Sequence, residues 1–278
     1  MRYAVLFAAV AMAADSQTIP LQPAGPSSLN PGIEHDATTA KDNLVAGKPV
    51  IRLTNITDPV LTFFPAPANS NSGAAVIVFP GGGYRILALD LEGTEICEWL
   101  NSIGINAALG KYRVPAAPGV LRHAAPIVDA GHALAAVRSH AAEWRIDPHR
   151  VGVIGFSAGG HLAALLSNAD ARPDFALLIY PAYLTPESDR TVLAPEFIVS
   201  AKTPPTFLIQ TEDDPIHVEN SLVYYGALKA NKVPAEMHLL ATGGHGYGLR
   251  VTAEAVTGWP KLAEAWLRSR GLLTAAAR

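Results

Sequence analysis

The chain has 278 residues, of which 49% are apolar and 16% are charged, and its formal net charge is −3. This composition supplies a sizeable buried core and excludes an intrinsically disordered chain. The small charge offers no electrostatic basis for binding nucleic acid or an anionic membrane, so neither is expected as a partner. The single cysteine, Cys97, excludes an internal disulfide, and no C-x-x-C or H-E-x-x-H spacing points to a dedicated metal site.

The N-terminal residues have the pattern of a secretory signal peptide. Arg2 is followed by an apolar run from Tyr3 to Ala14 that ends in small residues. The run is too short to span a bilayer as a helix, and no cysteine follows it that could carry a lipid anchor. We therefore expect a signal peptide over residues 1–14, export to the periplasm or the medium, and no stable membrane anchor. A buried N-terminal helix or strand is the alternative.

Three segments are expected after this run. Residues 15–49 are rich in Pro, Ser, Asn and Gly and are predicted to form an extended arm over the surface. Residues 50–278 show no interior linker and are predicted to form one domain. Within that domain, 182–205 has no clear period apart from a possible short helix at 196–200, and it lies where a lid would be inserted.

The domain alternates apolar strand-like runs with helical patterns. Strands are expected at 50–53, 60–64, 74–79, 105–109, 151–154, 175–180, 205–210 and 235–240, and helices at 90–102, 125–142, 219–230 and 257–270, besides one directly after Ser157. Such alternation predicts an α/β fold with a mostly parallel central sheet and helices on both faces.

A serine stands where one strand turns directly into a helix. The sequence V-G-V-I-G-F-S-A-G-G-H places Ser157 between Gly155 and Gly159 in a G-x-S-x-G pattern. Small neighbours are needed because the backbone is pinched at this turn. The hydroxyl then stands at a helix N-terminus, where the N–H of Ala158 favours a developing negative charge. The pattern also occurs by chance in glycine-rich chains, but here the strand before it and the helix after it predict Ser157 as a nucleophile.

A serine nucleophile needs a base and an acid nearby. Of the nine histidines, His245 lies in T-G-G-H-G-Y-G directly after the last expected strand, whereas His161 is expected to pack or cap. Asp213 and Asp214 follow the strand at 205–210, which gives the chain order serine, acid, histidine. Counting from the strand end favours Asp214 as the acid, with Asp213 as the alternate.

The triple glycine after Pro80 is predicted to supply oxyanion donors. Its bare backbone N–H groups follow an early strand, so Gly82 and Gly83 are expected to form an oxyanion hole together with Ala158. A phosphate loop is excluded because no G-x-G-x-x-G or G-K-S/T accompanies the glycines, and no cofactor is expected. Tyr84 and Tyr247 flank this site and are predicted either to stack on a sugar or acyl group or to pack.

These motifs together resemble secreted bacterial α/β-hydrolase esterases. The similarity runs from about Val50 to the C-terminus and is greatest to the branch of acetyl-xylan esterases and bifunctional feruloyl/acetyl-xylan esterases (BD-FAE-like). The motifs that carry it are P-G-G-G-Y, K-Y-R, G-F-S-A-G-G-H, D-D-P with E-N-S, and G-G-H-G-Y-G. Lipase-like esterases usually have histidine where this chain has Pro80, a departure that leaves the backbone donors intact.

The resemblance implies hydrolysis of short acyl esters, plausibly acetyl groups on plant polysaccharide fragments, with a small-molecule or oligosaccharide ester as substrate. An amidase, formamidase or peptidase with the same triad is an alternative. A non-catalytic binding module is a further alternative, but such a module is expected to lack one of the triad residues, and the sequence has a candidate for each of them.

Overall fold

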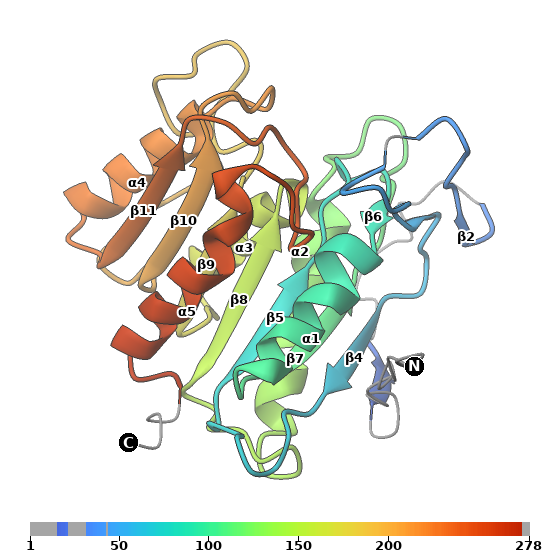
Figure 1. Ribbon diagram of the computed structural model, residues 1–278, viewed down its shortest axis with the longest axis vertical. Coiled ribbons are helices and arrows are strands. Elements are labelled where there is room, and N and C mark those ends of the chain that lie inside the picture. The colour runs from blue at the N-terminus through green and yellow to red at the C-terminus, as the bar shows by residue number, and fades with distance from the viewer. Residues whose placement is uncertain (1–15, 22–31, 43, 274–278) are drawn as a thin grey trace, which may run out of the picture.

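Strands and helices alternate along the chain and build one large sheet with helices on both faces (Figure 1). The computed structural model describes residues 16–21, 32–42 and 44–273. The expected signal peptide at 1–14 lies outside these residues. None of the helices in the described ranges is both long and apolar enough to cross a membrane.

The large sheet has the strand order β1-β4-β7-β5-β8-β9-β10-β11. From β7 to β11 neighbouring strands are parallel, whereas β4 is antiparallel to both β7 and β1. This confirms the predicted mostly parallel sheet. Its strands are β1 (Gln17–Pro20), β4 (Val60–Phe64), β5 (Ala75–Phe79), β7 (Asn106–Lys111), β8 (Val151–Phe156), β9 (Phe175–Ile179), β10 (Thr206–Thr211) and β11 (Ala235–Leu240).

Two helical layers cover the sheet. One core cluster joins it to α2, α3 and α4, and the other joins it to α1 and α5, which face the viewer in Figure 1. The helices are α1 (Glu95–Ser102), α2 (Ala124–Ser139), α3 (Ala158–Ser167), α4 (Glu219–Ala230) and α5 (Trp259–Ser269). A π-helical turn, η1 (Asp90–Thr94), precedes α1, and a short 3-10 turn, η2 (Ala255–Gly258), precedes α5.

The central strands are buried on both sides because both faces are covered. In β5, Ile77 belongs to the core under α2 and α3, whereas Val76 and Val78 belong to the core under α1 and α5. A continuous apolar run is what a strand in this position requires. The carboxyl ends of the parallel strands therefore meet at one edge, where the loops after β5, β8, β10 and β11 come together.

The N-terminal arm is more closely integrated than the sequence indicated. Part of it, β1, pairs with β4 as the edge strand of the large sheet, and Gln17 accepts a hydrogen bond from the Trp144 indole at 2.8 Å. A second part, β2 (His35–Asp36), forms a small antiparallel sheet with β3 (Arg52–Thr54) and β6 (Leu87–Ala88).

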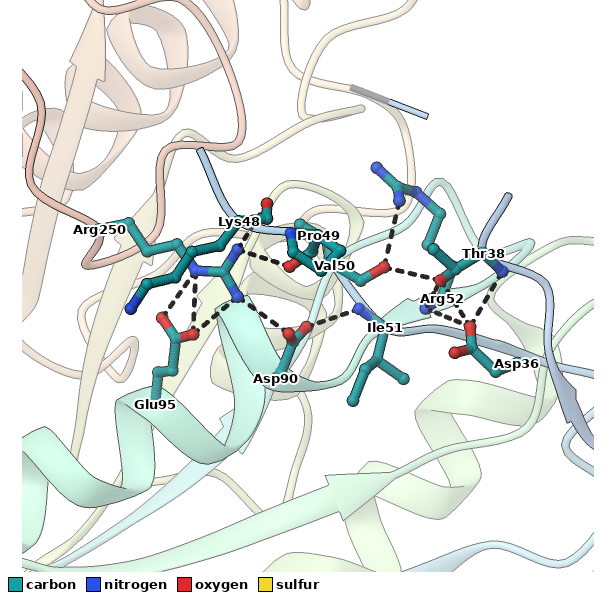
Figure 2. A network of polar contacts seen from close by, with 10 residues as sticks. All are labelled: Asp36, Thr38, Lys48, Pro49, Val50, Ile51, Arg52, Asp90, Glu95 and Arg250. Carbon is teal, nitrogen blue, oxygen red and sulfur yellow. Dashed lines mark hydrogen bonds and ion pairs between the residues drawn. The ribbon is translucent and has the colours of Figure 1, made fainter. Parts of the chain in front are cut away.

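Polar contacts join this arm to the rest of the domain (Figure 2). Asp36 accepts hydrogen bonds from Thr38 and from the N–H of Arg52. The Arg250 guanidinium contacts both Asp90 and Glu95, and it also donates to the backbone carbonyls of Lys48 and Pro49. The arm is thereby bound to the same turn that begins α1.

The segment at 182–205 is irregular, and the short helix considered at 196–200 does not form. Phe197 turns inward to pack on the rings of His161 and Tyr224, and its N–H donates to Ala194. The backbone around this buried ring forms a turn and not a helix.

Candidate active site

The serine turn has the strained geometry that its sequence predicts. Ser157 lies between β8 and α3 with φ +51° and ψ −116°, a conformation that non-glycine residues rarely adopt. A Cβ on Gly155 would collide with the backbone of Gly159, and a Cβ on Gly159 would collide with the Phe79 carbonyl. Glycine is therefore required at both positions for β8, β5 and α3 to approach one another around the serine.

Three side chains from separate loops form a continuous hydrogen-bonded row. His245 Nε2 lies 2.8 Å from Ser157 Oγ, and His245 Nδ1 lies 2.8 Å from Asp214 Oδ2. The Asp214 side chain is fully buried and also accepts hydrogen bonds from the Ile216 N–H at 2.7 Å and Gln210 Nε2 at 3.2 Å. The structure thus brings together the predicted serine, histidine and favoured acid in a geometry that allows proton transfer from the hydroxyl.

Asp213 has a different position from its neighbour. Its exposed carboxylate accepts hydrogen bonds from the N–H groups of Gly244 at 2.9 Å and Gly243 at 3.2 Å. These bonds, that from Gly244 foremost, lower the pKa of Asp213. Asp213 therefore holds the loop that carries His245 and does not contact the imidazole, as expected for the alternate of the two aspartates.

The triple-glycine loop lies directly beside the serine. A Cβ on Gly81 would lie 2.9 Å from the Ser157 Cβ, so the backbone of this loop borders the hydroxyl. Gly82 and Gly83 have φ values of +131° and +63°. Within the described ranges no acceptor lies within hydrogen-bonding distance of their N–H groups, and Ala158 is the first residue of α3, where the N–H has no intrahelical acceptor. The three predicted oxyanion donors are thus free to bind an anion.

The structure contradicts a stacking role for the two flanking tyrosines. Tyr84 is 1% exposed and Tyr247 is 4% exposed, so neither ring has a face open to a sugar or an acyl group. The positive φ of Tyr84, +57°, turns its ring inward, where its hydroxyl lies 2.8 Å from His161 Nδ1. Tyr247 packs edge-on against Tyr180. Packing is the interpretation that fits both residues.

His161 belongs to a polar cluster that the sequence did not indicate. Ligand atoms of His123, His161 and Glu196 lie within 4.8 Å of one another, so the three residues could hold a metal ion. His161 has hydrogen-bonding partners on both ring nitrogens, Tyr84 at 2.8 Å and Glu196 at 3.4 Å, and the His123 ring lies against it with centroids 5.3 Å apart. Burial lowers the pKa of His161, and the charge of Arg122 acts in the same direction on both histidines. The Glu196 carboxylate acts against this lowering in both histidines.

Sequence analysis also missed two buried groups beside the serine, Glu92 and Tyr180. The Glu92 carboxylate accepts hydrogen bonds from the Gly81 N–H at 2.6 Å and from the Tyr180 hydroxyl at 2.8 Å. Glu92 falls in a stretch whose sequence predicts an amphipathic helix, where a glutamate is normally expected on the solvent-exposed face. Its burial follows from the π-helical turn η1, which the sequence pattern does not indicate.

Comparisons with known proteins agree with this architecture. The model of the dienelactone hydrolase family matches residues 122–270, and the BD-FAE model matches residues 63–180. An acetylxylan esterase of Xylanibacter ruminicola is 31% identical over 204 residues, which cover 64% of this chain and 42% of the relative. The chain therefore spans less than half the length of that curated relative.

Solved structures give the same result over most of the chain. A structure described as an acetyl ester-xyloside bifunctional hydrolase from Caldicellulosiruptor lactoaceticus is 37% identical with a TM-score of 0.68, covering 77% of this chain and 89% of its own. MGS-M1, an α/β hydrolase from a Medee basin deep-sea metagenome library, is 27% identical with a TM-score of 0.67, covering 86% and 98%. These similarities confirm the predicted α/β-hydrolase fold.

Proposed function

The chain belongs to the dienelactone hydrolase family, and from this membership we propose that it is a serine carboxylesterase that hydrolyses short acyl esters. The observation that carries the proposal is the row of two 2.8 Å contacts from Ser157 through His245 to Asp214. Its position beside a glycine loop with free N–H groups suits a reaction that passes through an oxyanion.

The proposed mechanism uses each group once in each half of the reaction. Ser157 attacks the ester carbonyl while His245 takes the hydroxyl proton, and Asp214 stabilises the imidazolium. The N–H groups of Gly82, Gly83 and Ala158 stabilise the tetrahedral oxyanion. His245 then protonates the leaving alcohol, and water activated by the same histidine releases the acid from the acyl-enzyme.

Acetyl esters of plant polysaccharide fragments are the proposed substrates. The names of two relatives, an acetylxylan esterase and an acetyl ester-xyloside bifunctional hydrolase, support this class. The Tyr84 and Tyr247 rings are buried and present no open face to a sugar, and we propose that the acyl group is recognised close to Ser157.

The experiment compares wild type with Ser157→Ala on p-nitrophenyl acetate, butyrate and octanoate and on acetylated xylan. We expect turnover of the acetate, release of acetate from xylan, and a loss of kcat of at least about 10⁴-fold in Ser157→Ala. Ser139→Ala, an exposed serine at the end of α2, is the matched control and should keep full activity. Turnover that survives in Ser157→Ala would exclude this serine as the nucleophile.

A p-nitroanilide in the same assay separates the amidase alternative, because the triad alone suits amides as well as esters. Cleavage of the anilide with a kcat/KM comparable to that of the ester would replace the esterase proposal with an amidase or peptidase, because the anilide is intrinsically much less reactive. No turnover of either class would favour a binding module.

We also propose export of the protein through a signal peptide at residues 1–14. The apolar run after Arg2 supports this. N-terminal sequencing of protein recovered from the periplasm or medium should begin just after Ala14, whereas an intact Met1 terminus on cell-retained protein would contradict it.

A further inference from the structure

Glu92 is a buried acid that the proposed mechanism does not use. It is 4% exposed, and within the described ranges no lysine or arginine pairs with its carboxylate. Taking a carboxylate out of water is costly unless the surroundings compensate it. Buried ionisable groups of this kind are concentrated at functional sites, which makes Glu92 a candidate for a role in the reaction.

The surrounding donors suit the ionised form of this acid. The Gly81 N–H can only donate, and it points to Oε2 at 2.6 Å. The Tyr180 oxygen accepts the Gly248 N–H at 3.2 Å, which directs the Tyr180 proton to Glu92 Oε1 at 2.8 Å. Both carboxylate oxygens are therefore acceptors. Burial raises the pKa of Glu92, while the bonds from Tyr180 and Gly81 and the nearness of His245 act against that rise.

Through these bonds Glu92 connects the two loops that must be aligned for catalysis. Gly81 belongs to the glycine loop that borders Ser157, and Gly248 lies in the loop between β11 and η2 that carries His245. The Tyr180 ring lies between them, with its centroid 4.9 Å from that of the His245 imidazole at an angle of 63°. One carboxylate thus sets the oxyanion donors and the base relative to each other.

The helical turn that carries Glu92 is itself fixed from the opposite side. Figure 2 shows Arg250 held by Asp90 and Glu95, at 2.9 Å and 2.7 Å. Arg250 lies in the same loop as His245, so η1 is joined to that loop both through Glu92 and through Arg250. The wider π-helical turn at Glu92 is a local feature that often accompanies functional sites.

We propose that Glu92 is a positioning residue that holds the oxyanion loop against the histidine loop, and that its negative charge stabilises the protonated imidazole of His245 during acyl transfer. This inference rests on the proposed esterase function. Asp214 stabilises the imidazolium by direct contact, and Glu92 adds a second negative charge through the Tyr180 side. A charge that is fixed before the reaction begins needs no reorganisation when the imidazolium forms.

The test is Glu92→Gln, which preserves shape and removes the charge. On p-nitrophenyl acetate we expect kcat to fall about 10- to 100-fold with KM within about threefold, because the donors and the base lose their alignment but substrate binding is retained. The acidic limb of the kcat/KM profile should move to lower pH, since His245 loses a negative neighbour. Tyr180→Phe keeps the charge and loses the link, so it should lower kcat without moving the limb.

Glu98→Gln removes an exposed carboxylate from α1 and is the matched control, with kcat and limb expected to equal those of wild type. A Glu92→Gln enzyme with unchanged kcat, or one that is only less stable and keeps its pH limb, overturns the proposal. If Glu92→Gln does not fold, Glu92→Asp and Tyr180→Phe replace it, and unchanged kcat in both overturns the alignment role.

A titration of His245 separates this inference from the esterase proposal. In the Ser157→Ala background, imidazole NMR reports the pKa of His245 without any turnover. A lower pKa in the Glu92→Gln double variant supports the electrostatic role whatever the substrate is, and an equal pKa refutes it. Absence of ester turnover by the wild-type enzyme would instead refute the proposed function and leave the His245 titration unaffected.

Discussion

Replacement of Asp214 by asparagine should abolish most activity with little change in shape. Two of the donors to this carboxylate lie on opposite oxygens, the Ile216 N–H at 2.7 Å on Oδ1 and His245 Nδ1 at 2.8 Å on Oδ2, and Gln210 Nε2 also donates to Oδ2 at 3.2 Å. An asparagine has one oxygen for these two donors. Because the backbone N–H of Ile216 cannot become an acceptor, the asparagine oxygen should turn to it and present its NH₂ group to His245.

The magnitude follows from the tautomer that this amide imposes. With an NH₂ group facing Nδ1, the imidazole must carry its proton on Nε2, where it can no longer accept the proton of Ser157. A wrong tautomer of this kind lowers kcat about 10⁴-fold in a serine protease. At about 1.36 kcal/mol for each factor of ten, the barrier should rise by about 5 kcal/mol.

The matched variant is Asp213→Asn on the adjacent residue. Asp213 is exposed and accepts hydrogen bonds from the backbone of the histidine loop without contacting the imidazole, so we expect kcat of the Asp213→Asn variant to fall less than about tenfold. The assay is kcat and KM on p-nitrophenyl acetate, with circular dichroism to confirm folding. A loss below tenfold in Asp214→Asn, or an equal loss in Asp213→Asn, would refute the assignment of the acid.

Two further predictions concern stability. Gly159→Ala should lower the free energy of unfolding by at least about 3 kcal/mol or prevent folding, because its Cβ would collide with the Phe79 carbonyl. Gly131→Ala, in open space on α2, is the control and should be neutral or stabilising in the same urea titration. Equal urea midpoints for the two variants would contradict the packing argument. The second concerns His161, whose pKa is lowered by burial. Below about pH 6.5 the unfolded chain binds a proton that the folded protein does not, so the free energy of unfolding should decrease as the pH is lowered, and it should decrease less in His161→Asn. Equal pH dependence of the two proteins in urea titrations would refute this.

The position of the hydrogen-bonded row of Ser157, His245 and Asp214 could be predicted because its signals are local. Each of Ser157, Asp214 and His245 follows a strand of the parallel sheet, and the carboxyl ends of such strands meet at one edge. Counting from the end of β10 was enough to favour Asp214 over Asp213, since Asp214 is the one whose side chain turns under the histidine. The sequence motifs and the order of the three residues along the chain were together sufficient to predict this part of the site.

The residues that support this row could not be predicted because they converge from distant segments. Glu92 lies in η1, Tyr180 follows β9, and they meet through side chains alone. For Tyr84 the sequence left stacking on substrate and packing as alternatives, and the structure favours packing, since the residue has a backbone φ of +57° and its ring is buried in the core. No periodicity encodes such a turn. β1 was likewise missed, because a polar edge strand with one neighbour lacks the apolar run of a central strand.

The most direct test is to identify the residue that carries the acyl group during turnover. The purified enzyme is mixed with p-nitrophenyl acetate, quenched in acid within the first turnovers, digested, and mapped by mass spectrometry. A covalent mechanism through Ser157 predicts one acetyl group on the peptide that contains Ser157, and no acetylated peptide in Ser157→Ala. Acetylation of another residue, or rapid ester turnover with Ser157 never modified, would contradict the mechanism.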